Sequence, residues 1–206
     1  MTVSIVRRIA VALDVRVEVR ARWRAGDLDR LLNAKHSALH EEVARMFAEL
    51  PGWVTAPEVS FAIYGERGVI DILAWHPGRR ALLVIELKTD IADVNELLGT
   101  LDRKRRLATR IAAERGWRPL SVSCWLVVAA GRTNRARLAA HRAMIRAALP
   151  DDPRRMRRWI RDPNGPIALV SMWNAASGRQ DSRHTGRMSR NAAYRRVRVP
   201  VAPPRE

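Results

Sequence analysis

Charged residues inside a strand-like apolar run are the feature that most constrains this chain. The segment ALLVIELK, from Ala81 to Lys88, has the pattern of a buried β-strand, yet it carries Glu86 and Lys88. Ionised groups inside a sheet are costly unless they are paired or bind a metal. Any fold of this chain must therefore provide partners for these two charges.

A second acid is placed opposite this strand by the hairpin that the sequence predicts. The run GVIDILAW (68–75) is also strand-like, and HPGRR between the two runs is typical of a turn. The midpoint between Asp71 and Glu86 falls inside that turn. A hairpin centred there brings Asp71 opposite Glu86, with both side chains and that of Lys88 on one face.

Two carboxylates so close together in apolar surroundings repel each other. Either one of them takes up a proton or a divalent cation lies between them. Ligation by oxygen atoms alone favours Mg²⁺ or Mn²⁺ over zinc. The alternative is a plain ion pair of Lys88 with one of the acids at a sheet edge, but the apolar runs around them indicate central strands.

The rest of the pattern predicts one α/β domain over residues 31–174. A helical pattern over 27–50 is followed by three strand-like runs, a helix over 92–114 and a continuous apolar strand over 121–129. A further helix over 133–149 and a strand over 166–173 complete it. Residues 1–30 are expected to form an N-terminal extension. Residues 175–206, with eight arginines against two acids, are expected to be a disordered basic tail.

These residues resemble the motif of the PD-(D/E)xK nuclease superfamily, in which an acid at the end of one hairpin strand is followed by an acid-x-Lys on the next. The segments that match the motif are GVIDILAW and LLVIELK, and the resemblance covers about residues 34–130. It implies a restriction endonuclease-like αβββαβ core, with a mixed central sheet flanked by helices. The chain departs from the motif at Ile70, which stands where the motif has proline, a departure that many members share.

The resemblance also implies a function, the metal-dependent hydrolysis of phosphodiester bonds in DNA. Asp71 and Glu86 would hold Mg²⁺ or Mn²⁺, with the Leu87 carbonyl and water molecules as further ligands. Lys88 would orient and help to deprotonate the attacking water and stabilise charge on the phosphate. An acid from the first helix often completes such sites. Here that acid is Glu41 or Glu42, and the sequence does not separate them.

The charge of the chain favours DNA as a partner. There are 38 basic residues against 21 acidic ones, giving a formal charge of +17, although an arginine-rich proteome would give the same excess. Arg67 in a turn, and Lys104 and Arg105 on the helix after the motif, are expected phosphate contacts. The alternative is a simple bend and a solvated helix face. Only three basic residues are lysines, which indicates that Lys88 is selected as a compact amine.

A second resemblance lies at the N-terminus and suggests a different function. SIVRRIAVALDVRVEV resembles the last helix and trailing strand of a Cro/repressor-type helix-turn-helix domain, while the helix that would enter the major groove is missing. The alternative function is therefore a DNA-binding transcriptional regulator with an idle nuclease-like domain. An enzyme acting on nucleotides or another phosphoester is a third interpretation.

Location and assembly are constrained less strongly. No apolar run approaches the roughly 20 residues of a membrane span, and the N-terminus does not resemble a signal peptide. Cys124 is the only cysteine, so the chain has no internal disulfide. We therefore expect a soluble cytoplasmic protein without a membrane partner. The sequence leaves open whether the chain acts alone or as a homodimer.

Overall fold

The structure is a computed structural model that describes residues 26–174 and 179–180. The predicted helix-turn-helix remnant and most of the predicted tail lie outside the described residues. The first described helix, α2 (Gly26–Ala48), crosses the predicted boundary at residue 30. None of the described helices has the length and hydropathy needed to cross a bilayer.

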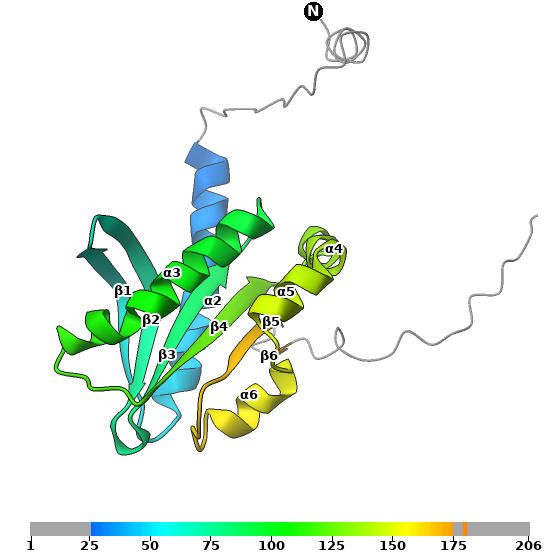
Figure 1. The fold of residues 1–206 in the computed structure, drawn as a ribbon. Helices are drawn as coiled ribbons and strands as arrows, with labels where there is room; N and C mark the ends of the chain where they lie inside the picture. Colours follow the sequence, from blue (N-terminus) through cyan, green and yellow to red (C-terminus); the bar gives the residue numbers. More distant parts are fainter. Residues whose placement is uncertain (1–25, 175–178, 181–206) are drawn as a thin grey trace, which may run out of the picture.

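The described residues form an α/β fold, in which a mixed parallel and antiparallel sheet is flanked by helices (Figure 1). This confirms the predicted α/β class and the predicted mixed sheet. The strands lie in chain order, β1-β2-β3-β4-β5-β6. The first three pair antiparallel, β3, β4 and β5 pair parallel, and β6 returns antiparallel. The strands are β1 (Val54–Ile63), β2 (Glu66–His76), β3 (Ala81–Lys88), β4 (Ser121–Ala129), β5 (Ala168–Asn174) and β6 (Arg179–Gln180).

Helices cover both faces of this sheet, because its central strands are apolar on both sides. In Figure 1, α3 crosses the front of the sheet and α2 lies behind it. The α3 side also holds residues of α5, and the α2 side holds residues of α6. These helices are α3 (Val94–Ala113), α5 (Arg142–Ala148) and α6 (Pro153–Trp159), and α4 (Arg132–Ala140) follows β4.

The predicted helix over 133–149 is wrong in one respect, because it is two helices. The chain leaves helical geometry at His141, where φ is −107° and ψ is 24°. Both halves contact the apolar core on the α3 side, α4 through the partly buried Leu138. Asn134 is the buried residue of α4, whereas Ile145 of α5 enters the apolar core on the α3 side. The sequence analysis also missed α6, which starts at Pro153 with Asp152 as its N-cap.

The hairpin of β2 and β3 has the predicted register. Ile72 pairs with Ile85 and His76 with Ala81, so the hairpin is centred between Gly78 and Arg79. The turn contains a short 3₁₀ helix, Pro77–Arg79, and Arg80 adopts a left-handed conformation with φ of 49°. This register brings the two acids of the motif to the same end of the hairpin.

Candidate functional site

The candidate site lies where β2 separates from β3, at Asp71 and Glu86, and we call this point the fork. The ladder between these strands runs to Ile72 and Ile85, and one further step in the same register reaches Asp71 and Glu86. Before Asp71, β2 is paired only with β1. The Leu87 amide donates a hydrogen bond of 2.6 Å to Oδ2 of Asp71. A side-chain oxygen of β2 therefore takes the place of a backbone acceptor at the fork.

The backbone of β1 and β2 is irregular at the same position. The ladder between them skips the pair Glu58 and Asp71, and Glu58 has a positive φ of 47°. On either side of Asp71, Ile70 and Leu73 pack into the same core although they are three residues apart. Strict alternation would place them on opposite faces, so the strand turns its side chains at Asp71. This local twist helps to position the carboxylate at the fork.

Glu86 is a buried carboxylate held by two ammonium groups. Its side chain is 1% exposed. Oε1 lies 2.8 Å from Nζ of Lys88, and Oε2 accepts a hydrogen bond from Nζ of Lys104. Both of these bases are lysines in a chain that has only three. The buried charge that the sequence analysis singled out is therefore partnered twice.

Lys104 is not on the exposed ridge where we expected a phosphate contact. It is 5% exposed and lies on the apolar side of α3, between Leu101 and Leu107. Its spacing from the buried residues of that side explains this position, because residues three or four apart share a helix face. The sequence contained this signal, a lysine in the apolar stripe, but the neighbouring arginines obscured it.

Burial and the charge of Glu86 set the protonation of Asp71 and Lys88, the two partly buried groups. Burial, followed by the negative charge of Glu86, raises the pKa of Asp71, and these effects outweigh the Leu87 amide and the two ammonium groups. Burial alone would lower the pKa of Lys88, but the negative charges of Glu86, Asp71 and Glu96 and the hydrogen bond to Glu86 together outweigh burial, so that the pKa of Lys88 is raised. Lys88 is therefore an ammonium at neutral pH. It is suited to stabilising negative charge rather than to accepting a proton.

Helix α2 approaches the site from the opposite face of the sheet through His40 rather than through an acid. The His40 ring nitrogen Nε2 lies 3.3 Å from the backbone oxygen of Asp71. Glu41 is exposed, and Glu42 is half-buried with Arg45 at 4.0 Å. Within the described residues, neither glutamate contacts Asp71 or Glu86. The sequence analysis missed His40 because its contact is with a backbone oxygen, which no motif records.

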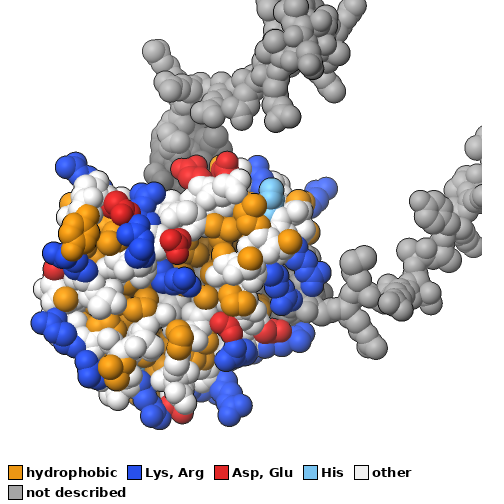
Figure 2. All heavy atoms as spheres, in the orientation of Figure 1, with side chains coloured by type: hydrophobic (Ala, Val, Ile, Leu, Met, Phe, Trp, Pro, Cys, Tyr) orange, Lys and Arg blue, Asp and Glu red, His pale blue; other side chains and the backbone are white. Residues whose placement is uncertain are grey.

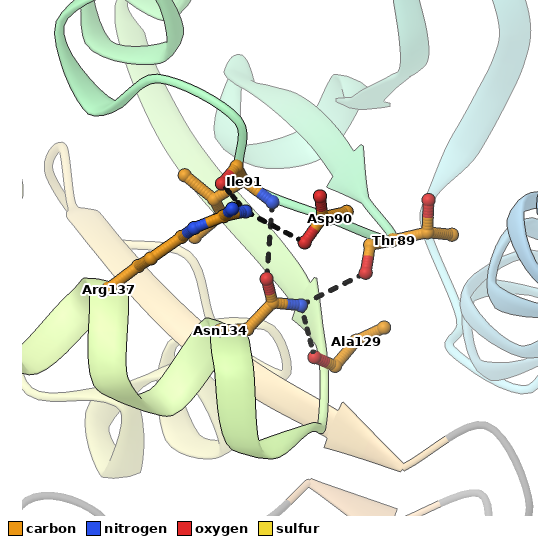
Figure 3. Close-up of polar contacts among 6 residues, drawn as sticks. All are labelled: Thr89, Asp90, Ile91, Ala129, Asn134 and Arg137. Carbon is orange, nitrogen blue, oxygen red and sulfur yellow. Dashed lines mark hydrogen bonds and ion pairs between the residues drawn. The ribbon is translucent and has the colours of Figure 1, made fainter. Parts of the chain in front are cut away.

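The segment after β3 is fixed to β4 by one buried side chain, Asn134 (Figure 3). Its Oδ1 accepts from the Ile91 amide at 3.1 Å, and its Nδ2 donates to the Thr89 and Ala129 oxygens at 3.0 and 2.9 Å. Arg137 supports the same segment through an ion pair of 2.9 Å with Asp90. These contacts begin one residue after Lys88 and hold the end of its strand in place.

Two of the expected DNA contacts are on the surface. Arg67 is exposed on β2, and Arg105 is exposed on α3 with Asp102 at 3.8 Å. Figure 2 shows that the basic side chains on this face are spread around the rim with acidic groups among them. Ion pairs contribute to this mixing, because Glu66 contacts both Arg103 and Arg106 of α3. The basic charge therefore forms separate points on this face rather than one continuous surface.

The donor set at the fork suits a hard divalent cation held weakly. Asp71 and Glu86 offer carboxylate oxygens, the ligands that Mg²⁺ prefers. Among the described residues no group of three or more His, Cys, Asp and Glu side chains is placed to hold a metal. Backbone oxygen and water would have to complete the shell, and the role of the Leu87 carbonyl stays a prediction. Both oxygens of Glu86 already contact ammonium groups, which reduces the attraction for a cation.

Comparison of the chain with protein-family models, with curated proteins and with solved structures gives no match. A functional assignment therefore depends on the geometry of the site itself.

Proposed function

We propose that this chain is a metal-dependent nuclease of the PD-(D/E)xK type, which hydrolyses phosphodiester bonds in DNA. The observation that carries the proposal is the meeting of Asp71, Glu86 and Lys88 at the fork between β2 and β3. The element order α2, β1, β2, β3, α3, β4 supports it, because the resemblance implies a helix, three strands, a helix and a strand.

In this proposal each charged group has a distinct role. Asp71 and Glu86 would hold Mg²⁺ or Mn²⁺, which supplies a more acidic water and a positive charge beside the phosphate. Lys88, protonated at neutral pH, would orient the water and donate to a phosphate oxygen as negative charge develops there. Water adds to phosphorus, and one P–O ester bond breaks.

Lys88 is well placed for this role because it is neither free nor fully enclosed. Its side chain is 35% exposed, whereas those of Glu86 and Lys104 are 1% and 6% exposed. A phosphate oxygen can therefore reach the Lys88 ammonium from solvent without the sheet opening. The Asn134 contacts after β3 limit the movement of this strand end.

The second candidate is a DNA-binding regulator with an idle nuclease-like domain. One observation favours it, namely that both oxygens of Glu86 are occupied by lysines. If Lys104 is never displaced and Glu86 never binds a metal, the cluster only stabilises the fold. The surface arginines would then bind DNA through its phosphates, without cleavage.

A cleavage experiment separates the two candidates. The protein is incubated with supercoiled and branched DNA in the presence of Mg²⁺ or Mn²⁺, in parallel with Lys88→Met and Lys35→Met. Lys35 is an exposed lysine of α2 and is the matched control. The nuclease proposal predicts metal-dependent cleavage by the wild type and Lys35→Met that is lost in Lys88→Met. Salt-sensitive binding without cleavage by any of the three proteins would support the regulator instead.

A further inference from the structure

The contact of Lys104 with Glu86 brings a second buried ammonium to the fork. Lys104 comes from α3, and its side chain is 6% exposed where it reaches Oε2 of Glu86. Lys88 already contacts Oε1 of the same carboxylate. An ion pair that one lysine could form is thus formed by two, and the second lysine occupies a position of the helix that is otherwise apolar.

The charges of the cluster balance without a metal. Of the four charged groups at the fork, Asp71 and Glu86 carry two negative charges when ionised, and Lys88 and Lys104 carry two positive charges. Glu96 of α3 lines the same pocket as Lys88 and acts on its charge from outside these four groups. A divalent cation added to this neutral cluster leaves an excess of two positive charges in partly buried surroundings, where charges are poorly screened. The phosphates of DNA supply the negative charge that would offset this excess.

We infer that Lys104 is a positioning residue that makes metal binding depend on bound DNA. This inference rests on the proposed nuclease function. Lys104 balances the carboxylates while the site is empty of substrate, and so it opposes binding of the metal alone. A phosphodiester at Lys88 carries one negative charge and reduces this excess, and the neighbouring phosphates of the strand reduce it further, so that metal and DNA bind together more tightly than either binds alone. The site then acquires its metal mainly when a substrate is present.

The inference is tested by measuring metal affinity rather than cleavage. Mn²⁺ is titrated calorimetrically into the full chain, with and without a cleavage-resistant phosphorothioate duplex. The proteins are the wild type, Lys104→Met and the exposed control Lys35→Met. Methionine keeps the length and apolar volume of the lysine stem but removes the ammonium. Circular dichroism verifies folding, and Lys104→Gln replaces the methionine variant if that variant does not fold.

Three results are expected. Wild type and Lys35→Met bind Mn²⁺ at least about tenfold more tightly with the duplex than without it. Without DNA, Lys104→Met binds Mn²⁺ at least about tenfold more tightly than the wild type, because a positive charge near the cation is gone. The duplex then strengthens Mn²⁺ binding less in this variant than in the wild type.

Two outcomes would overturn the inference. One is a wild type whose Mn²⁺ affinity is the same with and without DNA, a result that does not depend on whether any variant folds. The other is a folded Lys104 variant that binds Mn²⁺ no more tightly than the wild type. In both cases the proposed nuclease stands as long as the wild type binds Mn²⁺ and cleaves DNA. Absence of any Mn²⁺ binding, with or without DNA, would instead remove the proposed function.

Discussion

The backbone nitrogen of Leu87 lies 2.6 Å from Oδ2 of Asp71, so a side chain of one strand completes the hydrogen bonding of the next. This contact places the carboxylate where β2 and β3 separate. The same carboxylate is partly buried and close to the charge of Glu86, which raises its pKa. The hydrogen bond at the fork and the protonation of Asp71 therefore involve the same carboxylate, and substitutions of Asp71 test both.

The effect of Asp71 on stability is expected to depend on pH. Because the pKa of Asp71 is higher in the folded protein than its ordinary value of 3.8, the folded state holds its proton longer as pH rises. The stability that this group contributes is complete below 3.8 and is lost as pH rises through the raised pKa. Asp71→Asn keeps an oxygen that can accept from the Leu87 amide. Because asparagine does not ionise, this variant does not lose stability at this position as pH rises.

As pH rises from acidic to neutral, the free energy of unfolding of Asp71→Asn should therefore increase relative to that of the wild type. Urea unfolding of both proteins at several pH values tests this. Asp71→Ala is the control for the hydrogen bond, and it should cost about 1–3 kcal/mol because the Leu87 amide loses its acceptor. A difference between Asp71→Asn and wild type that is constant with pH would contradict the assigned pKa direction.

The ion pair between Glu86 and Lys104 should behave as a buried pair. Glu86→Gln leaves the Lys104 ammonium without a carboxylate and is expected to cost about 3–5 kcal/mol of unfolding free energy. The double variant Glu86→Gln, Lys104→Met should be more stable than Glu86→Gln alone, because no unpaired buried charge remains.

A surface pair provides the control for this cycle. Glu66 is 32% exposed and contacts Arg106, which is 55% exposed, at 3.0 Å. Glu66→Gln should cost only about 0–1 kcal/mol, as is usual for exposed pairs. Equal costs for Glu66→Gln and Glu86→Gln in urea unfolding would show that the buried cluster contributes no more than the surface one.

Much of the fold could be predicted from the sequence, because hydrophobic patterning and the turn between β2 and β3 determine it locally. The bounds of β3 and β4, the hairpin register and the apolar side of α3 all follow from such patterns. Strand β1 begins at Val54, before the strand-like run EVSFAIY (58–64). The start was not predictable because Pro57 and the positive φ of Glu58 interrupt the pattern.

The site was predictable only in part, for a physical reason. The meeting of Asp71 with β3 depends on hairpin symmetry, which short-range sequence spacing can reveal. The approach of Lys104 and of His40 depends on how helices pack on opposite faces of the sheet. The apolar stripe of α3 indicates that Lys104 faces the sheet, but no local pattern specifies which strand residue either helix residue meets.

Asn134 is expected to be the most sensitive residue of α4. Asn134→Ala leaves the Ile91 amide and the Thr89 and Ala129 oxygens without this partner. The expected cost is about 2–4 kcal/mol of unfolding free energy, since buried polar groups lose their hydrogen bonds. Cleavage by the folded variant should also decrease, because the segment after Lys88 is less firmly held. Thr133→Ala, an exposed neighbour, is the matched control, and an equal effect there would contradict the role of Asn134.

Binding to DNA should depend on the exposed arginines and not on the buried lysine. Arg67→Ala and Arg105→Ala, both at exposed positions, should each weaken binding and reduce the slope of log K against log salt by about 0.9. Lys104→Met should leave this slope unchanged at low metal concentration, because its ammonium is buried against Glu86. Fluorescence anisotropy with a labelled duplex over a range of salt concentrations measures all three slopes. A reduced slope for Lys104→Met alone would reverse this assignment.

The central claim is that Asp71 and Glu86 together hold a divalent cation when DNA is bound. The most direct measurement is a calorimetric titration of Mn²⁺ into the complex of the protein with a cleavage-resistant duplex, comparing wild type with Asp71→Asn. We expect one Mn²⁺ site in the wild type and a loss of affinity of at least about tenfold in Asp71→Asn, because one anionic ligand is removed. No uptake of Mn²⁺ by the wild-type complex, or equal affinity in the two proteins, would contradict it.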